Sequence, residues 1–222
     1  MTESARQSGI RAFIDLGTNS VRLSIVRFQP GQPPLVLAQR KETVRLGEGE
    51  FGSGLLQPAA MARAAAVCRE FAEMARAKGA GSTVAIATSA TRDAGNQAEF
   101  LALLRARTGL EVEVVSGREE ARLIYRGVAG GLHLGRRRAL FIDIGGGSTE
   151  LIVGDQRDAL FLDSLKLGAI RLSSLYFRPD ESGPVSEDRY ALIRHHVEGV
   201  AVRAVTELRA LAPELAVGSS GT

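Results

Sequence analysis

The sequence lacks the features that mark secreted, membrane-spanning or metal-clustering proteins. It has no tryptophan, one cysteine and three histidines among 222 residues. One cysteine cannot form an internal disulfide, and so few Cys and His residues exclude a His/Cys metal site by spacing. No apolar run approaches the roughly 20 residues of a membrane-spanning helix, and the polar start, MTESARQSG, does not fit a secretory signal. We therefore expect a cytoplasmic protein with no membrane partner.

The charge balance is mild and well mixed. Lys and Arg number 28 against 25 Asp and Glu, which gives a net charge of +3, and the one dense basic cluster is Arg136–Arg138. Proteins that bind duplex nucleic acid usually gather Lys and Arg beside a groove-reading element. The sequence contains no such element, so we expect no nucleic-acid partner, while a small polyanionic substrate is compatible with this balance.

Missing motifs exclude several classes of enzyme. There is no GxxxxGK[ST] motif and no Gly-Lys pair, which excludes a P-loop NTPase, and there is no GxSxG elbow of a serine hydrolase. GEGEFG (47–52) has the GxGxxG spacing but does not open a helix in a βαβ unit, so we interpret it as a flexible loop. His133, His195 and His196 lie in no motif. Cys68 falls on the apolar face of a predicted helix and is expected to be buried and inert.

Short apolar strands and amphipathic helices follow each other in an order that predicts an α/β fold. Asn96 with Glu99, and Ser116 with Glu119, have the spacing of helix capping boxes. The predicted strands are 11–16, 21–28, 35–46, 83–87, 110–115, 139–144, 150–153, 160–165 and 215–217, and the predicted helices are 58–78, one starting at 96, 116–128 and 187–211.

The two halves of the sequence repeat one another. FIDLGTNS (13–20) and FIDIGGGS (141–148) agree at Phe, Ile, Asp, Gly and Ser, and AIATSAT (85–91) matches AVGSSGT (216–222) in kind. Repetition of this sort indicates a duplicated structural unit. The first copy continues with helix, strand and helix after AIATSAT and the second does not. We therefore expect a first domain at 1–128 and an incomplete second domain at 129–222.

Both repeated segments have the composition of anion-binding turns between strands. Glycine lets the backbone curl so that successive N–H groups point at one anion, hydroxyls add donors, and an aspartate at the strand end can hold a divalent cation. Two such loops, one from each half, would face each other across a cleft and grip one polyphosphate. The candidate phosphate-binding residues are Asp15, Gly17, Thr18, Asn19, Ser20, Gly145, Gly146, Gly147 and Ser148.

These motifs resemble, in order, those of the exopolyphosphatase and guanosine pentaphosphate phosphohydrolase family, within the actin-like ATPase superfamily. DLGTNSVRL and DIGGGSTEL look like the two phosphate loops of that family. Further similar stretches are VRLGEG (44–49), ATSATRDAGN (87–96), SGREEARLIY (116–125), LGAIRL (167–172) and VGSSGT (217–222). The resemblance spans nearly the whole chain and implies two ribonuclease-H-like domains with a cleft between them.

The resemblance also implies a catalytic residue. The catalytic glutamate of the family corresponds to Glu120, the second Glu of REEAR. The residues themselves agree with this assignment, because Glu119 has a role in closing the capping box and Glu120 is left to face the cleft. In the first turn of a helix, the helix dipole favours an ionised carboxylate, which could orient or deprotonate the attacking water.

The remaining site residues are likewise implied by the family. Asp143 and Glu150 would lie around Mg²⁺ or another divalent cation and the terminal phosphate. Arg45 and Arg92 resemble the phosphate contacts of the family, and a guanidinium suits phosphate oxygens because it can donate two hydrogen bonds at once.

We therefore expect a Mg²⁺-dependent phosphohydrolase that removes the terminal phosphate of inorganic polyphosphate or of guanosine pentaphosphate. Two alternatives stay open. The shortened second domain allows a polyphosphate- or nucleotide-binding module or fragment without turnover, or a site completed in a homodimer. A sugar-type kinase of the same superfamily is disfavoured by the REEAR helix, since such kinases usually place an aspartate elsewhere as base.

Overall fold

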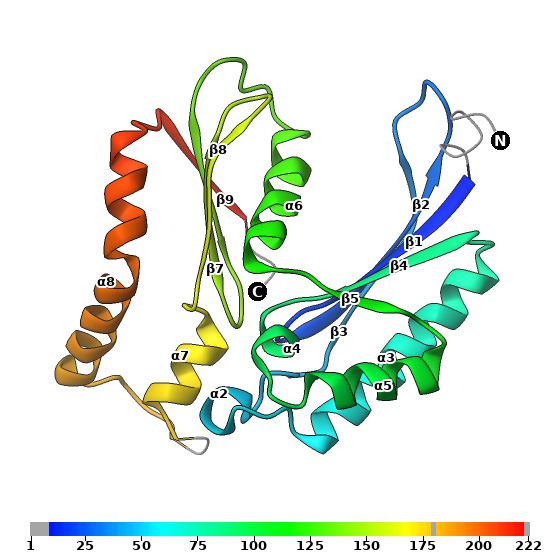
Figure 1. The fold of residues 1–222 in the computed structure, drawn as a ribbon, viewed down its shortest axis with the longest axis horizontal. Helices are drawn as coiled ribbons and strands as arrows, with labels where there is room; N and C mark the ends of the chain where they lie inside the picture. Colours follow the sequence, from blue (N-terminus) through cyan, green and yellow to red (C-terminus); the bar gives the residue numbers. More distant parts are fainter. Residues whose placement is uncertain (1–8, 179–180, 220–222) are drawn as a thin grey trace. The chain divides into compact units, whose positions relative to one another are not determined.

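The computed structural model describes residues 9–178 and 181–219, so the polar first residues and the last three residues of VGSSGT lie outside the described ranges. The chain divides into two compact units, Met1–Val114 and Val115–Thr222. Each unit contains its own β-sheet (Figure 1).

The first unit is a five-stranded sheet with its two long helices packed on one face (Figure 1). Its strand order is β3-β2-β1-β4-β5, in which β2 is antiparallel to both of its neighbours, and β4 is parallel to β1 and to β5. The elements are β1 (Gly9–Leu16), β2 (Ser20–Phe28), β3 (Leu35–Thr43), α2 (Glu50–Ser53), α3 (Pro58–Ala77), β4 (Ser82–Ala87), α4 (Ser89–Asp93), α5 (Gln97–Thr108) and β5 (Val112–Val114).

The core of the first unit follows from the two sequence periods. Alternate residues of β1 turn inward, so Ala12, Ile14 and Leu16 are buried against the helices. Helix α3 starts with proline at its first turn and buries one face, including Cys68 and Phe71. The predicted burial of Cys68 is confirmed, and burial raises the pKa of its thiol to about 12.

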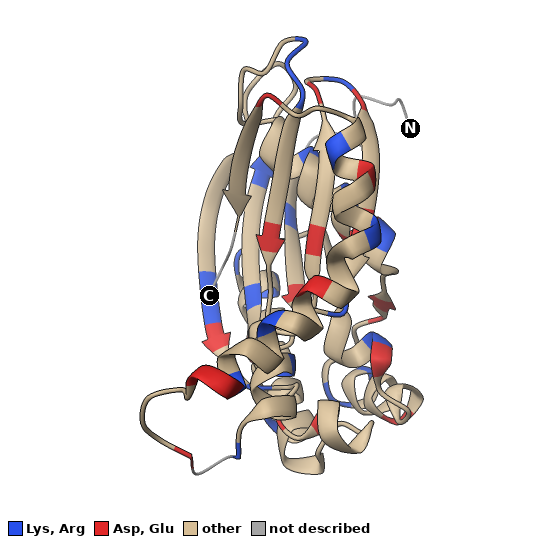
Figure 2. Ribbon diagram, turned by 90° about the vertical axis from the view of Figure 1, so that its left-hand side faces the viewer, with Lys and Arg blue, Asp and Glu red and all other residues tan. Residues whose placement is uncertain are grey.

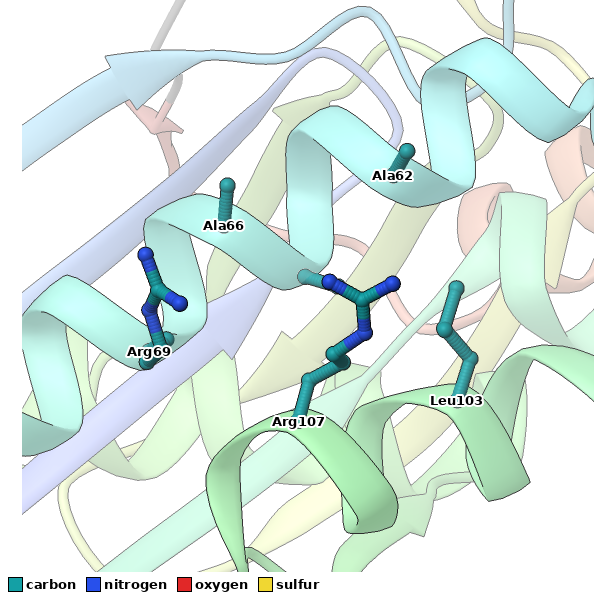
Figure 3. A pocket seen from close by; sticks show the side chains of 6 residues that line it. Ala62, Ala66, Arg69, Leu103 and Arg107 are labelled. Carbon is teal, nitrogen blue, oxygen red and sulfur yellow. The ribbon is translucent and has the colours of Figure 1, made fainter.

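A shallow groove of about 90 Å³ lies where α3 packs beside α5 (Figure 3). It holds none of the predicted site residues. Its lining residues are Ala62, Ala65, Ala66, Arg69, Leu103 and Arg107.

The second unit repeats the plan of the first. Its sheet has the order β8-β7-β6-β9, which matches β3-β2-β1-β4 strand for strand, with the same antiparallel and parallel pairings. The predicted duplication and the predicted α/β class are therefore confirmed. The elements are α6 (Gly117–Ala129), β6 (Ala139–Ile144), β7 (Thr149–Gly154), β8 (Ala159–Leu165), α7 (Ala169–Tyr176), α8 (Glu187–Ala210) and β9 (Leu215–Ser219).

Helix α6 belongs to the second unit, whereas the sequence analysis placed it at the end of a first domain reaching residue 128. Its buried residues, Ala121 and Tyr125, join a core cluster with Phe141 and Ile152 of the second sheet. The neighbouring Val153 points to the opposite face, where α8 packs. The division between the units consequently falls at Val114/Val115, because the apolar face of α6 is buried on the second sheet.

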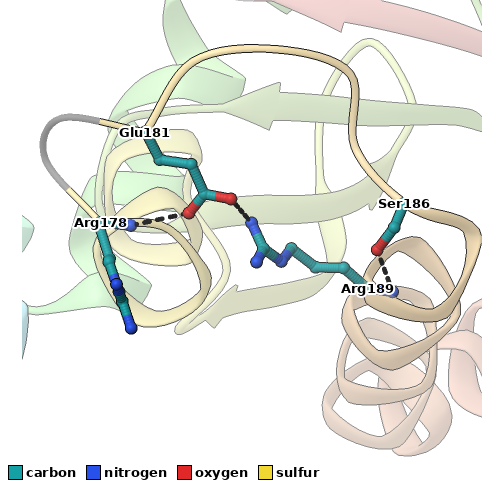
Figure 4. Close-up of polar contacts among 4 residues, drawn as sticks. All are labelled: Arg178, Glu181, Ser186 and Arg189. Atoms are coloured by element: carbon teal, nitrogen blue, oxygen red, sulfur yellow. Dashed lines mark hydrogen bonds and ion pairs between the residues drawn. The ribbon is translucent and has the colours of Figure 1, made fainter.

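Helix α8 is only partly buried, although its predicted apolar face runs along its whole length. Ala204 and Leu208 are buried near its C-terminal end, while Tyr190 near its start is 63% exposed. The start of α8 is fixed by polar contacts with the chain that follows α7 (Figure 4). Glu181 pairs with the Arg189 guanidinium, and Ser186 Oγ accepts a hydrogen bond from Arg189 N at 3.4 Å.

Three short helices, α2, α4 and α7, replace segments that the sequence pattern predicted as loop or turn. GEGEFG overlaps the start of α2 and buries Glu50, so it is a packed turn rather than a flexible loop. The capping box expected at Asn96 does not form. The Asn96 side chain instead bonds the backbone of Leu56, accepting from its N–H at 2.9 Å and donating to its carbonyl at 3.0 Å.

Charged residues of both signs are spread over the helices and strands (Figure 2), as the mixed composition predicts. Within residues 9–178 and 181–219, no helix combines the length and apolarity needed to cross a membrane.

Candidate active site

The first glycine loop connects β1 to β2 and is held by the chain that follows β3. Gly17 N donates to Ser20 O at 3.0 Å, which closes the turn. Two carbonyl groups of the loop accept hydrogen bonds from backbone N–H groups that follow β3. Val44 N and Arg45 N donate to Asn19 O at 2.9 and 2.8 Å, and Gly47 N donates to Thr18 O at 2.9 Å.

Asp15 lies at the end of β1, directly opposite Arg22 of β2. Both line an open hollow of about 530 Å³, together with Arg40 and Lys41 of β3. Three cations and one carboxylate make this hollow a basic one. Arg22, Arg40 and Lys41 were not predicted from the sequence, since only strand register brings them to one end of the sheet.

The two predicted arginine contacts of the first unit lie at the same sheet edge as this loop. Arg45 follows β3 with a left-handed backbone (φ 49°), and its side chain is exposed. Arg92 lies in the last turn of α4 and is half-buried. Helix α4 begins beside the end of β1, because Thr88 N donates to Leu16 O at 3.2 Å.

The second glycine loop has the same closure as the first. Gly145 N donates to Ser148 O at 2.9 Å. Asp143 and Glu150 flank the loop as register partners on β6 and β7, and directly opposed residues of an antiparallel pair project from the same face. Two acidic side chains therefore project together beside the loop.

Glu150 is the most buried of these acidic groups, with 2% of its surface exposed. Burial, followed by the nearby Glu120 and Asp143 carboxylates, raises the pKa of Glu150 to about 7. Hydrogen bonds from Ser164 and Ser148 act in the opposite direction. The Ser164 Oγ donor lies 2.8 Å from Glu150 Oε1. Three carboxylates are thus close enough to interact within the second unit.

Glu120 reaches this group from the first turn of α6, where it is half-buried. Ser116 caps the helix as predicted, since its Oγ accepts from Glu119 N at 3.1 Å. The Glu119 carboxylate accepts from Arg122 Nη1 at 2.8 Å. The two adjacent glutamates therefore differ in environment. The candidate catalytic residue and the candidate metal ligands all belong to the second unit, not to two different domains as expected.

Two serines that were not predicted from the sequence bond these carboxylates. Ser164 contacts Glu150 from β8, and Ser219 Oγ donates to Asp143 Oδ2 at 3.3 Å from β9. Both serines are distant in sequence from their partners. Strand register is the one indication that could have located them, because Ser164 and Ser219 are register partners of Glu150 and Asp143.

The residues beside the second loop offer the oxygen donors that a divalent cation binds. Within the described ranges, no three or more His, Cys, Asp or Glu side chains form a complete metal-binding group. Mg²⁺ commonly takes only one or two carboxylates and completes its shell with water and substrate phosphate oxygens. Asp143 and the buried Glu150 supply such a pair, and a cation would relieve the repulsion among the three carboxylates.

Comparison with known proteins shows the family to which the chain belongs. The family model described as the Ppx/GppA phosphatase family matches residues 24–222. The chain belongs to the Ppx/GppA phosphatase family.

Curated Ppx/GppA relatives match nearly the whole chain but are longer. This chain is 35% identical over 210 residues to "Exopolyphosphatase 1" of Mycobacterium tuberculosis, and the match covers 94% of this chain and 60% of the relative. It is 34% identical over 215 residues to a guanosine-5'-triphosphate,3'-diphosphate pyrophosphatase of Aeromonas hydrophila, covering 97% of this chain and 42% of that protein. The chain thus spans about 60% or less of the length of these relatives.

Solved Ppx/GppA structures share the fold. The crystal structure of an exopolyphosphatase from Cytophaga hutchinsonii aligns with a TM-score of 0.90 at 29% identity, over 96% of this chain and 67% of that one. The predicted actin-like ATPase fold class is confirmed.

The raised pKa of Glu150 predicts how the stability of this Ppx/GppA protein depends on pH when no divalent cation is bound. Its folded-state pKa is raised from 4.5 to about 7, so the folded state binds the proton more tightly than the unfolded state. The associated stability is present below pH 4.5 and is lost as pH rises through 7, a change of about 3 kcal/mol.

The measurement is the free energy of unfolding by urea at pH 5 and pH 7.5 in EDTA, for the wild type and for Glu150→Gln. The variant should lose most of this part of the pH dependence, because glutamine does not titrate. An equal change in the free energy of unfolding between pH 5 and pH 7.5 for the two proteins would contradict the prediction.

Proposed function

We propose that this chain carries the phosphohydrolase centre of a Ppx/GppA enzyme. The reaction releases the terminal phosphate of inorganic polyphosphate, or converts guanosine pentaphosphate to the tetraphosphate. The names of the two relatives motivate the two substrates. The observation that carries the proposal is the group of three carboxylates, Glu120, Asp143 and Glu150, beside the second glycine loop.

The loop supplies the groups that bind phosphate. No hydrogen bond within the described residues uses the N–H groups of Gly146 and Gly147, so both can donate to phosphate oxygens. In the first unit, the loop from Asp15 to Ser20, with Arg45 and Arg92, offers a second set of donors for a polyanion. Mg²⁺ held by Asp143 and Glu150 would neutralise charge on the phosphate oxygens.

Glu120 acts on the water in this proposal. Its carboxylate orients a water molecule and accepts a proton as the water oxygen bonds to the terminal phosphorus. The bond from that phosphorus to the bridging oxygen breaks, and the bridging oxygen leaves with the shortened chain. The products are inorganic phosphate and a chain one phosphate shorter. Catalysis of this kind rests on placement and on electrostatic stabilisation.

Phosphate release from long-chain polyphosphate and from guanosine pentaphosphate, with Mg²⁺ and with EDTA, tests the proposal. We expect Mg²⁺-dependent release from at least one of the two substrates. Binding without release from either would overturn the hydrolase proposal and favour a non-catalytic binding module. Transfer of phosphate from ATP to a sugar acceptor would favour the kinase alternative.

We also expect a homodimer that completes the site, a cytoplasmic location, and no nucleic-acid or membrane partner.

A further inference from the structure

The segment that follows β8 is bonded to the second glycine loop through backbone groups. Ala169 N donates to Gly145 O at 3.0 Å, and both Ile170 N and Arg171 N donate to Gly146 O, at 2.8 and 3.0 Å. Two successive carbonyl groups of the loop are therefore held by one short segment at the start of α7.

The Arg171 side chain holds the next carbonyl. Its Nε donates to Gly147 O at 2.6 Å. A hydrogen bond from a guanidinium is stronger than one between neutral groups. Arg171 is half-buried. Its backbone and side chain together bond two adjacent peptide groups of the loop.

Holding the carbonyls fixes the direction of the N–H groups. A trans peptide is planar, and its C=O and N–H point in opposite directions. The carbonyls of Gly145, Gly146 and Gly147 belong to the same peptide groups as the N–H groups of Gly146, Gly147 and Ser148. Bonding all three carbonyls to 169–171 therefore aims three successive N–H groups away from that segment, as in an anion-binding nest.

The first loop is held in a related way but without a charged side chain. There, Thr18 O and Asn19 O accept only backbone N–H donors from 44–47 among the bonds found in the described residues. The guanidinium is thus an addition specific to the second loop, the one that lies beside Glu120, Asp143 and Glu150.

We propose that Arg171 is a positioning residue for phosphate binding, acting through the Gly147 carbonyl to aim the Ser148 N–H group. The proposal rests on the proposed function, because the bound group is the terminal phosphate of the substrate. Loss of the guanidinium frees the peptide between Gly147 and Ser148 to rotate and lowers the affinity of the loop for phosphate. The bond lost is charge-assisted, so binding should weaken on the order of 10- to 100-fold.

The test compares Arg171→Met, Arg171→Lys and the control Arg194→Met, an exposed arginine of α8 paired with Glu198. Calorimetry gives the Kd for inorganic phosphate with Mg²⁺, and steady-state assays give KM and kcat. We expect Arg171→Met to raise Kd and KM together by the same factor. Arg171→Lys should restore part of the loss, because lysine can also donate to the Gly147 carbonyl, and Arg194→Met should leave both unchanged.

Unchanged Kd and KM in a folded Arg171→Met protein would overturn the proposal. If that variant does not fold, Arg171→Gln decides, because its uncharged side chain cannot form the charge-assisted bond: wild-type thermal stability with weaker phosphate binding supports the proposal, and full phosphate binding overturns it. A wild type that binds phosphate but releases none would overturn only the proposed hydrolysis, since the Arg171 comparison is also read from the phosphate Kd.

Discussion

Replacing Glu120 with glutamine is expected to lower kcat for phosphate release by roughly 10²- to 10⁴-fold, the usual contribution of a positioned general base. Glutamine keeps the size and most of the polarity of the side chain but cannot accept a proton at neutral pH. The fold should not suffer, since the Glu120 charge raises the pKa of Glu150. Removing that charge reduces repulsion, so the variant should be at least as stable as the wild type at pH 7.5.

The adjacent residue provides the matched control. Glu119 forms a partly exposed ion pair with Arg122, and ion pairs at the surface contribute little to stability. Glu119→Gln should therefore retain near-normal turnover. Phosphate release and urea unfolding measured on both variants separate catalysis from folding. Near-normal turnover by a folded Glu120→Gln protein would remove Glu120 from the mechanism.

The duplicated plan of the fold was predictable because it depends on local patterns. Alternating residues such as Ala12, Ile14 and Leu16 define the strands, and the repeated FID segments indicate equivalent hairpins in the two sheets. Helices α4 and α7 were not predicted. They are short, and α7 buries no residue, so their sequences contain too few turns to establish an apolar helical period.

The position of α6 shows where one-dimensional reasoning fails. The sequence predicts an amphipathic helix starting at Ser116, but it does not tell which sheet receives the apolar face. Packing of Tyr125 on Phe141, with ring centroids 5.6 Å apart, places the helix on the second sheet. This packing also brings Glu120 near Glu150, a proximity that family resemblance could suggest but composition could not.

Partners of the site residues were the hardest to predict. Asp143 and Glu150 were named together because one hairpin carries both. Ser164, Ser219 and Arg171 were not, since their contacts depend on register between strands and on the path of the chain after β8. Side chains orient a site when they lie close to it in three dimensions. A single sequence does not show which distant residues lie close together.

Gly168→Ala is expected to disrupt the second loop more severely than any surface change in the same unit. A Cβ at this position would lie 2.5 Å from the carbonyl carbons of Gly146 and Gly147, which are backbone atoms. Real Cβ contacts are almost never that short, so the loop or the segment must move. Such overpacking typically costs about 1–3 kcal/mol, and displacing groups that position substrate by about 1 Å can reduce turnover roughly 10²-fold.

Gly199→Ala is the matched control for this substitution. Gly199 lies inside α8, and apart from the adjacent backbone of that helix a Cβ there would contact no described heavy atom within 4 Å. Alanine is favoured over glycine in a helix by about 1 kcal/mol, so this variant should gain stability and keep its activity. Urea unfolding, the phosphate Kd and kcat measured on both variants test the contrast. Wild-type phosphate binding by Gly168→Ala would contradict this prediction. The second loop would then keep its N–H groups in place even after the backbone at residue 168 had been forced away from it.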